Sequence, residues 1–478
     1  MMLPGVAALA AGRLAALFGL GVAIVAAVAA APPRAAAATI RLSAGEDIQA
    51  AVDRAAAGDI IRLAPGRYDG QVRLDKPLVL EGEAGAALVG PGRGSVITVL
   101  APGAVVRGLD IRGSGMDLEP MDAGVFVEQT AAGALVEGNL LEGNLYGVYL
   151  HGAPDAVVRG NRIRGLQQRR INEAGNGVSI WNAPGARVED NDVRFGRDGI
   201  FVVTSRNNTF RNNRFADVRF AVHYMYTNDS EVSGNVSTNN AAGFTIMYSH
   251  RLLVRNNISD GDRDRAFLFN YANSSEITGN VAIGRLRPAE YWAMVGQRAA
   301  PAGEHGLSGE DAGEGAAGTV AWRIAPEKCV FIYNANNNRF HGNRFEGCEI
   351  GIHFTAGAEG NEISGNAFIN NRRQVKYVGT RYLDWSKAGR GNYWSDNPAF
   401  DLDGDGLADT AYRPNDLIDQ VLWTAPQAKV LLNSPAVQVL RWAQSQFPAL
   451  LPGGVVDSHP LMAPPPSPVP SGAASGPS

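Results

Sequence analysis

The sequence of 478 residues is poor in cysteine and carries no excess of charge of either sign. Two cysteines exclude a disulfide-dense scaffold and a zinc site built from four thiolates. The 43 Lys and Arg residues against 47 Asp and Glu residues give a formal net charge of −4, which argues against a basic nucleic-acid-binding protein. With 57 Gly, 26 Pro and 45% apolar residues, the composition is typical of a folded, turn-rich protein.

Long apolar runs are also scarce, and the one that stands out lies at the N-terminus. Arg13 precedes an apolar run from Leu14 to Ala31, and Ala35 to Ala38 supplies the small residues that a signal peptidase reads. This pattern predicts a secretory signal peptide over residues 1–38, and a periplasmic location if the source is Gram-negative. An uncleaved anchor is the alternative, although the run is short for a membrane span.

A repeat of about 22 residues organises the centre of the chain. Each unit starts with a small residue followed by apolar, variable and apolar positions, and an Asn such as Asn161 or Asn191 follows 14 or 15 residues later in every unit. Short strands closed by Gly-Asn turns at this length predict an all-β, right-handed parallel β-helix of the pectate-lyase type, with a ladder of stacked Asn side chains. The units begin at Gly124, Gly147, Gly177, Gly199, Ala221, Gly243, Ala266, Cys329 and Gly351.

The rest of the chain is organised around these coils. Residues 39–123 should form an N-terminal cap and about two irregular coils, residues 124–390 the β-helix with an insertion at 285–328, residues 391–462 a C-terminal module, and residues 463–478 a disordered tail. Eleven coils would give a rod of roughly 50 Å. Each end of such a rod exposes strand edges and needs a cover.

Short helices are predicted as these covers. One runs from Asp47 to Ala57, with Ser43 as a candidate N-cap. Two more lie within residues 416–447, broken at Pro426 and restarted by Pro435 at a first-turn position. These C-terminal helices carry more apolar side chains than one coil end can bury, which predicts a docking patch unless the helices bury them against each other.

Strand alternation separates side chains that fill the bore from those on the outer face. The outer positions are unexpectedly aromatic, Met and His, which indicates that a loop, a partner or a ligand covers them. On this face Met225 and Met247 share one position in consecutive coils, and His223 lies two residues before Met225. Thioether and imidazole ligands suit Cu(I), whereas hydrophobic filler under the insertion is the alternative. The loop from Met116 to Met121 is either an ordinary loop or a source of a further thioether.

For two other groups of residues the sequence alone does not decide between a structural and a functional role. Asp401, Asp403, Asp405 and Asp409 with Gly406 reproduce much of a calcium-binding loop, but Tyr412 replaces the bidentate Glu, so Ca²⁺ and a plain Asp-rich turn are both admissible. Cys329 takes the place of a small buried residue at a unit start. In an oxidising compartment Cys329 and Cys348 are able to form a disulfide.

Several longer strings stand out at residues 221–230, 331–335, 374–379, 391–406, 412–416 and 431–442. Together they resemble the NosD family, whose members are periplasmic β-helical proteins that serve copper-site maturation of nitrous oxide reductase. The resemblance covers nearly the whole mature chain, and its C-terminal strings are more specific than a generic β-helix pattern. The insertion at 285–328 looks longer and more Gly-rich than the family leads us to expect.

The resemblance implies a non-enzymatic protein of denitrification that works with the membrane subunit of an ABC transporter, a copper chaperone and nitrous oxide reductase, and that meets the membrane only through the transporter. Cu(I) would be held transiently. A carbohydrate-active enzyme with the same coil, such as a polysaccharide lyase, hydrolase or epimerase, would need clustered acid and base groups, and the outer face offers one carboxylate, Glu128. A carbohydrate-binding rod is the third interpretation.

Overall fold

The computed structural model describes residues 37–167, 173–286, 288, 327–355, 357–379, 381–424, 428, 431, 434–446 and 453–466. These residues belong to the compact unit that begins at Ala38, whereas the predicted signal peptide lies almost entirely outside them. The insertion predicted at 285–328 and the tail after residue 466 also fall largely outside the described residues. No described helix is both long enough and apolar enough to traverse a bilayer.

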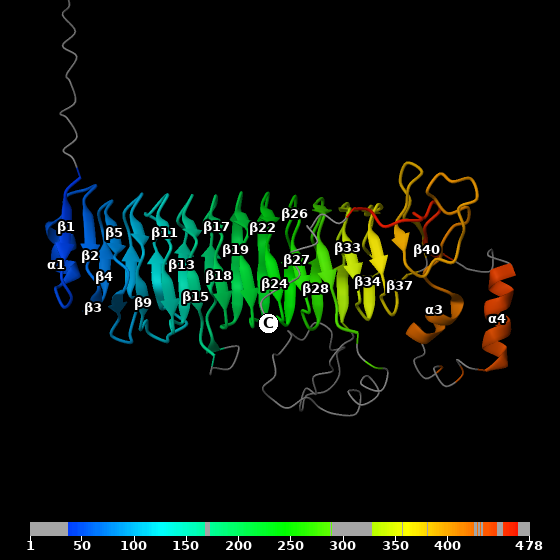
Figure 1. Ribbon diagram of the computed structural model, residues 1–478, viewed down its shortest axis with the longest axis horizontal. Coiled ribbons are helices and arrows are strands. Elements are labelled where there is room, and N and C mark those ends of the chain that lie inside the picture. Colours follow the sequence, from blue (N-terminus) through cyan, green and yellow to red (C-terminus); the bar gives the residue numbers. More distant parts are fainter. Residues whose placement is uncertain are drawn as a thin grey trace, which may run out of the picture. The chain divides into compact units, whose positions relative to one another are not determined.

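Each coil contributes one strand to each of three long parallel sheets, and Figure 1 shows the coils stacked in chain order. The first sheet has thirteen strands: β1 (Thr39–Leu42), β2 (Ile60–Leu63), β5 (Val79–Gly82), β8 (Val105–Arg107), β11 (Leu135–Glu137), β14 (Val157–Arg159), β17 (Arg187–Glu189), β20 (Thr209–Arg211), β23 (Glu231–Ser233), β26 (Leu253–Arg255), β29 (Glu276–Thr278), β32 (Arg339–His341) and β35 (Glu362–Ile363). The second also has thirteen: β3 (Gly66–Asp69), β6 (Ala86–Val89), β9 (Asp110–Arg112), β12 (Leu140–Glu142), β15 (Arg162–Arg164), β18 (Asp192–Arg194), β21 (Arg214–Ala216), β24 (Val236–Thr238), β27 (Ile258–Asp260), β30 (Val281–Ile283), β33 (Arg344–Glu346), β36 (Ala367–Ile369) and β39 (Tyr393–Trp394).

The third sheet carries the face on which the copper ligands were predicted. Its twelve strands are β4 (Val72–Leu74), β7 (Ile97–Val99), β10 (Ala123–Val127), β13 (Tyr146–His151), β16 (Val178–Trp181), β19 (Asp198–Arg206), β22 (Phe220–Asn228), β25 (Ala242–Met247), β28 (Arg265–Asn270), β31 (Lys328–Tyr333), β34 (Ile350–Thr355) and β37 (Val375–Val378). The topology confirms the predicted right-handed parallel β-helix.

The strands of the third sheet obey the alternation read from the sequence. Val125, Val148 and Ile200 occupy one inward row and are fully buried. The inward side chains become larger toward the middle of the stack, where Phe244 and Phe267 stack with ring centroids 5.1 Å apart. A continuous apolar core therefore fills the bore and fixes which side chains of β19, β22, β25 and β28 face outward.

The predicted Asn ladder is confirmed and is longer than expected. Each Asn donates a side-chain Nδ2 hydrogen bond to Oδ1 of the next, at 2.8 to 3.1 Å. The backbone N–H of each residue donates to the same oxygen of its neighbour, as Asn213 does to Asn235. The ladder therefore pairs buried polar groups that the tight turns would otherwise leave unsatisfied. Its members are Asn139, Asn161, Asn191, Asn213, Asn235, Asn257, Asn280, Asn343, Asn366 and Asn392.

Two expectations for the N-terminal part were wrong. The early coils vary in length, since Ile60, Val79, Val105 and Leu135 are successive sheet partners, yet they pair in the same three sheets as the later coils. Two sheets consequently have thirteen strands, where eleven coils were expected. The capping helix α1 (Ile48–Arg54) begins after Asp47, whose carboxylate accepts the Ala50 N–H at 3.1 Å, so Asp47 is the N-cap in place of Ser43.

The C-terminal module closes the other end of the ladder. Helices α3 (Leu417–Thr424) and α4 (Pro435–Gln446) confirm the two predicted pieces. Strand β38 (Tyr382–Asp384) pairs with β40 (Gly454–Val456), and the next residue, Asp457, accepts the N–H of Asn392 at 2.6 Å and the indole N–H of Trp394 at 2.8 Å. Asp457 thereby satisfies the last Asn of the ladder.

The two cysteines form a disulfide. Cys329, at the start of β31, and Cys348, in the turn before β34, lie 5.7 Å apart between Cα atoms and are buried. The bridge joins two points of one coil directly after the insertion, so it anchors the returning chain. Of the two interpretations left open by the sequence, the structure supports the pairing.

Candidate functional site

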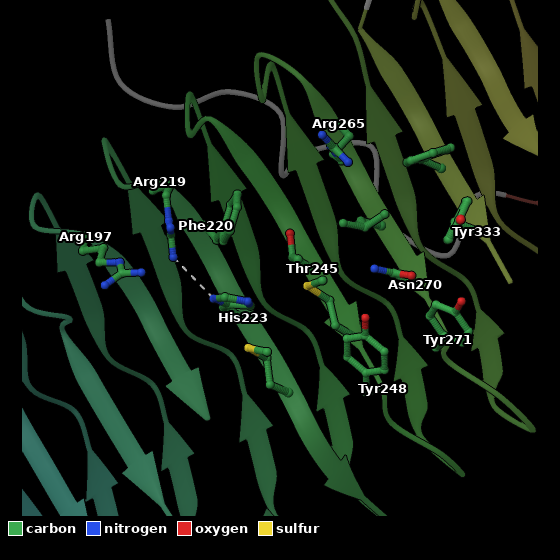
Figure 2. Close-up of a pocket in the computed structure, with 14 residues that line it drawn as sticks. Arg197, Arg219, Phe220, His223, Thr245, Tyr248, Arg265, Asn270, Tyr271 and Tyr333 are labelled. Carbon is green, nitrogen blue, oxygen red and sulfur yellow. Dashed lines mark hydrogen bonds between the residues drawn. The ribbon is translucent and has the colours of Figure 1, made fainter. Parts of the chain in front are cut away.

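A cavity of about 530 Å³ opens on the outer face of the third sheet, across β19 to β31 (Figure 2). Consecutive coils place residues at equal strand positions side by side, so the lining forms rows along the stack. One row runs through His223, Thr245 and Leu268, and the next through Met225, Met247 and Asn270. The lining consists of Arg197, Arg219, Phe220, His223, Met225, Thr245, Met247, Tyr248, Arg265, Leu268, Asn270, Tyr271, Phe331 and Tyr333.

His223 is held by a buried ion pair beneath it. Asp198 accepts two hydrogen bonds from Arg219, at 2.8 and 2.6 Å, and its Oδ2 lies 3.2 Å from His223 Nδ1. Burial alone would raise the pKa of the Asp198 carboxyl, but the hydrogen bond from His223 and the charge of Arg219 hold that pKa well below its usual range. The carboxylate is therefore ionised at neutral pH, and it favours the tautomer with hydrogen on Nδ1 and a lone pair on Nε2.

The two methionines lie together as the sequence predicted. Met225 and Met247 are direct partners in the β22–β25 register, and both line the same cavity as His223. Met247 is buried and Met225 is half-buried. An imidazole nitrogen and two thioether sulfurs form a soft donor set, and none of the described residues that line the cavity offers a carboxylate or a thiolate. This set fits Cu(I) better than Zn²⁺ or Ca²⁺. Met116 and Met121 do not line this cavity.

A row of tyrosines borders the methionines. The rings of Tyr226, Tyr248 and Tyr271 stack with centroids 5.1 and 5.2 Å apart, and Tyr333 meets Tyr271 edge to face at 6.0 Å. The first three adopt positive φ angles of 49° to 50°, a backbone conformation that is costly for a bulky residue. Packing along the row offsets this cost, and the row gives the cavity a rigid aromatic rim.

Comparisons with known proteins decide the family. The family model described as "Periplasmic copper-binding protein (NosD)" matches residues 165–399, a range that contains every residue lining the cavity. The chain is also 39% identical over 400 residues to a protein of Pseudomonas aeruginosa PAO1 named "Probable ABC transporter binding protein NosD", covering 84% of this chain and 87% of that one. A protein of the same name from Stutzerimonas stutzeri is 41% identical over 401 residues, covering 84% and 86%. The chain belongs to the NosD family.

Solved structures similar to this NosD-family chain are distant. A PL6 alginate lyase complexed with a trisaccharide has a TM-score of 0.47 at 13% identity, covering 74% of this chain and 92% of the lyase. A family 28 exopolygalacturonase of Yersinia enterocolitica has a TM-score of 0.46 at 12% identity, covering 72% and 77%. At this distance neither likeness bears on the chemistry of the site.

The Asp-rich loop lies just beyond the range matched by the NosD model. Carboxylate oxygens of Asp401, Asp403 and Asp405 come within 4.8 Å of one another. Asp409, predicted as a fourth ligand, is not part of this group, and its carboxylate accepts the Leu402 N–H at 2.8 Å. Tyr412 donates its hydroxyl to Asp396 instead of contributing to the loop. The carboxylates of Asp401, Asp403 and Asp405 also accept backbone N–H groups within the loop.

Sequence reasoning missed the residues that support His223. Arg197 and Arg219 each stand two positions before the unit starts Gly199 and Ala221, so their shared position relative to the repeat was available as a signal. Asp198 is separated from His223 by 25 residues, and what links the two is their contact between adjacent coils. Comparing the first residue of each strand with the residues of the strand in the next coil would have brought this pair together.

Proposed function

We propose that this protein is the periplasmic component of an ABC-transporter complex and that it delivers or inserts copper during maturation of the copper centres of nitrous oxide reductase. The observation that carries the proposal is the soft donor set of His223, Met225 and Met247 in one open cavity. The description of the family as periplasmic and copper-binding supports it, as does the name that the relatives share.

In this proposal copper is cargo. His223 binds Cu(I) through Nε2, and Met225 and Met247 bind it through their sulfurs. Asp198 positions the imidazole and makes it a better donor, because it accepts the hydrogen bond from Nδ1. Neutral thioethers hold Cu(I) without the charge of a thiolate, so a copper chaperone on one side and the reductase on the other are able to exchange the ion with the site.

The alternative of a carbohydrate-active enzyme finds less support. None of the fourteen described residues that line the cavity is Asp or Glu, whereas glycoside hydrolysis uses two carboxyl groups that flank the scissile bond. Glu128, the one outward carboxylate noted on the coils, does not line the cavity either. A carbohydrate-binding rod remains compatible with the tyrosine row, and a glycan-array experiment would reveal it.

We also propose that Ca²⁺ bridges Asp401, Asp403 and Asp405. Asp409 would stabilise the loop through the hydrogen bond that its carboxylate accepts from the Leu402 N–H. The loop is connected to the last coil, since Met462 N–H donates to Gly406 O and Leu461 N–H donates to Asn392 O. Ca²⁺ bound there would stabilise the contact between the C-terminal module and the end of the β-helix.

Titration with Cu(I) in competition with a chromophoric chelator tests the copper site. We expect wild-type protein to bind Cu(I) in preference to Zn²⁺, and the double variant Met225→Ala with Met247→Ala to bind Cu(I) at least about 100-fold more weakly, because two of three donors are lost. The double variant Met116→Ala with Met121→Ala is the matched control and should bind as wild type does. Equal affinities of wild type and the Met225/Met247 variant would refute this site.

A further inference from the structure

The cavity that holds the proposed copper ligands also contains an unpaired positive charge. Three guanidinium groups line it. Arg219 is paired with Asp198 and Arg265 with Asp264, whereas Arg197 has no carboxylate partner among the residues that the structure describes. Its Nε is buried and without a hydrogen-bond partner within the same residues. Burial, followed by the charge of Arg219, lowers the pKa of Arg197.

The remaining polar groups of the cavity are unsatisfied as well. Thr245 is 1% exposed and Asn270 is 6% exposed, and Thr245 Oγ1 and Asn270 Oδ1 have no hydrogen-bond partner among the described residues. Both line the cavity, and Figure 2 shows them on the same outer face as Arg197. A buried polar atom without a partner is costly, so three of them around one opening indicate a polar ligand.

The charge of copper points to the nature of that ligand. Cu(I) bound by an imidazole and two thioethers keeps its full positive charge, because all three donors are neutral. Arg197 and Arg219 lie in adjacent coils, joined by the hydrogen bond from the Arg219 N–H to the Arg197 carbonyl at 2.6 Å, and the Arg219 guanidinium lies 3.4 Å from His223 Nδ1. Because Asp198 compensates the charge of Arg219, the repulsion that a cation would meet here comes from Arg197, and an anion that accompanied the cation would offset it.

We propose that Arg197 and the adjoining cavity wall form a subsite for a small free anion, and that the anion accompanies Cu(I) as its counter-ion or further ligand. The role of the anion beside Cu(I) rests on the proposed copper function, whereas the binding of an anion at Arg197 concerns the copper-free protein. Thr245 supplies a hydroxyl donor, and the stacked rings of Tyr248 and Tyr271 border the same cavity. No covalent bond of the protein is made or broken and no oxidation state changes, and the anion enters and leaves with the cargo.

Thiocyanate is a suitable probe because its infrared C≡N stretch reports binding directly. We expect the full-length, copper-free protein to bind thiocyanate saturably and Arg197→Gln to bind it at least about tenfold more weakly. Arg197→Lys keeps the charge and should retain thiocyanate binding. That result would show that Arg197→Gln binds weakly because the charge is lost and not because the protein misfolds. Arg164→Gln, at an ion-paired arginine outside the cavity, is the control and should bind as wild type does. Binding to Arg197→Gln with wild-type affinity would overturn the subsite.

A second titration separates the anion from the copper. Linkage requires thiocyanate and Cu(I) to change each other's affinity by the same factor, and we expect a gain of at least about tenfold in wild type that is absent in Arg197→Gln. The Met225→Ala, Met247→Ala variant should lose Cu(I) binding yet still bind thiocyanate. If that variant bound Cu(I) normally, the copper ligands would be wrong while the anion subsite stood. Thiocyanate binding without any effect on Cu(I) affinity would refute the counter-ion role.

Discussion

At the scale of single residues, two buried carboxylates make contacts that are hard to foresee from the sequence. Asp198 and Asp262 are both fully buried in the coil walls, but their surroundings differ. Asp198 meets Arg219 and His223 and keeps its charge, whereas Asp262 accepts hydrogen bonds from the hydroxyls of Ser237 and Ser259 and from the Asn240 N–H. Among the residues that the structure describes, no cation offsets the burial of Asp262, and this burial raises the pKa of its carboxyl to about 6.

This difference predicts a pH effect on stability. The folded pKa of Asp262 lies above its usual value of 3.8, so the folded state binds the proton more tightly than the unfolded state. Its contribution to stability is complete below pH 4 and is lost as the pH rises through 6, by about 2–3 kcal/mol. Asp262→Asn should abolish that loss, as measured by urea unfolding at pH 4.5 and pH 7. Asp217→Asn, an exposed control, should retain the wild-type difference, and an unchanged pH profile in Asp262→Asn would contradict the assignment.

The repeat explains which residues of the site could be predicted from the sequence. His223, Met225 and Met247 follow directly from the coil period, because equal offsets in successive coils must be neighbours. Arg197 lies in the turn before β19 and Asp198 is the first residue of that strand, at positions whose side-chain contacts the repeat does not specify. The unsatisfied state of Thr245 and Asn270 depends on every atom around them, so periodicity has no bearing on it.

At the scale of elements, the fold was predictable where side chains repeat and unpredictable where they do not. The coils from Gly124 onward carry both the small residue at the strand start and the Asn of the ladder. The coils of β2, β5 and β8 lack the Asn and vary in length, so they escaped alignment although they pair equally well. The closing contact of Asp457 with Asn392 spans 65 residues and has no period at all.

The Asp-rich loop yields a prediction at this scale. If Ca²⁺ binds Asp401, Asp403 and Asp405, excess Ca²⁺ should raise the melting temperature by several degrees above that in EDTA, because ligand bound to the folded state alone stabilises it by mass action. Asp403→Asn with Asp405→Asn should melt at the same temperature in both conditions. Identical melting curves of the wild type in EDTA and in excess Ca²⁺ would leave the loop as a turn without metal.

At the scale of the whole molecule, the C-terminal helices offer a surface for a partner. Ile418 of α3 and Val437 of α4 pack together in a small cluster of their own, so part of the apolar surplus is buried between the helices. Val439 is nevertheless 62% exposed and Leu440 44% exposed. We propose that this face of α4 docks on the periplasmic side of the ABC membrane subunit, which would hold the protein at the membrane.

A charge placed on this face should weaken that contact. We expect Val439→Glu to reduce co-purification with the transporter at least about fivefold, because docking would bury an unpaired carboxylate. Gln438→Glu adds the same charge to the same helix at another exposed position and should leave the yield unchanged. Substitution is preferable to deleting residues 416–462, since that deletion would also remove Asp457 from the end of the Asn ladder. Wild-type yield with Val439→Glu would place the contact elsewhere, on the coil faces.

The central claim is that His223, Met225 and Met247 together hold Cu(I), and X-ray absorption spectroscopy of the copper-loaded protein tests it most directly. The site predicts a first shell with two sulfur scatterers and one imidazole nitrogen. In the Met225→Ala, Met247→Ala variant the sulfur contribution should disappear from whatever copper remains bound, while Met116→Ala with Met121→Ala should leave the spectrum unchanged. A first shell without sulfur in the wild type, or one that persists in the Met225/Met247 variant, would contradict the claim.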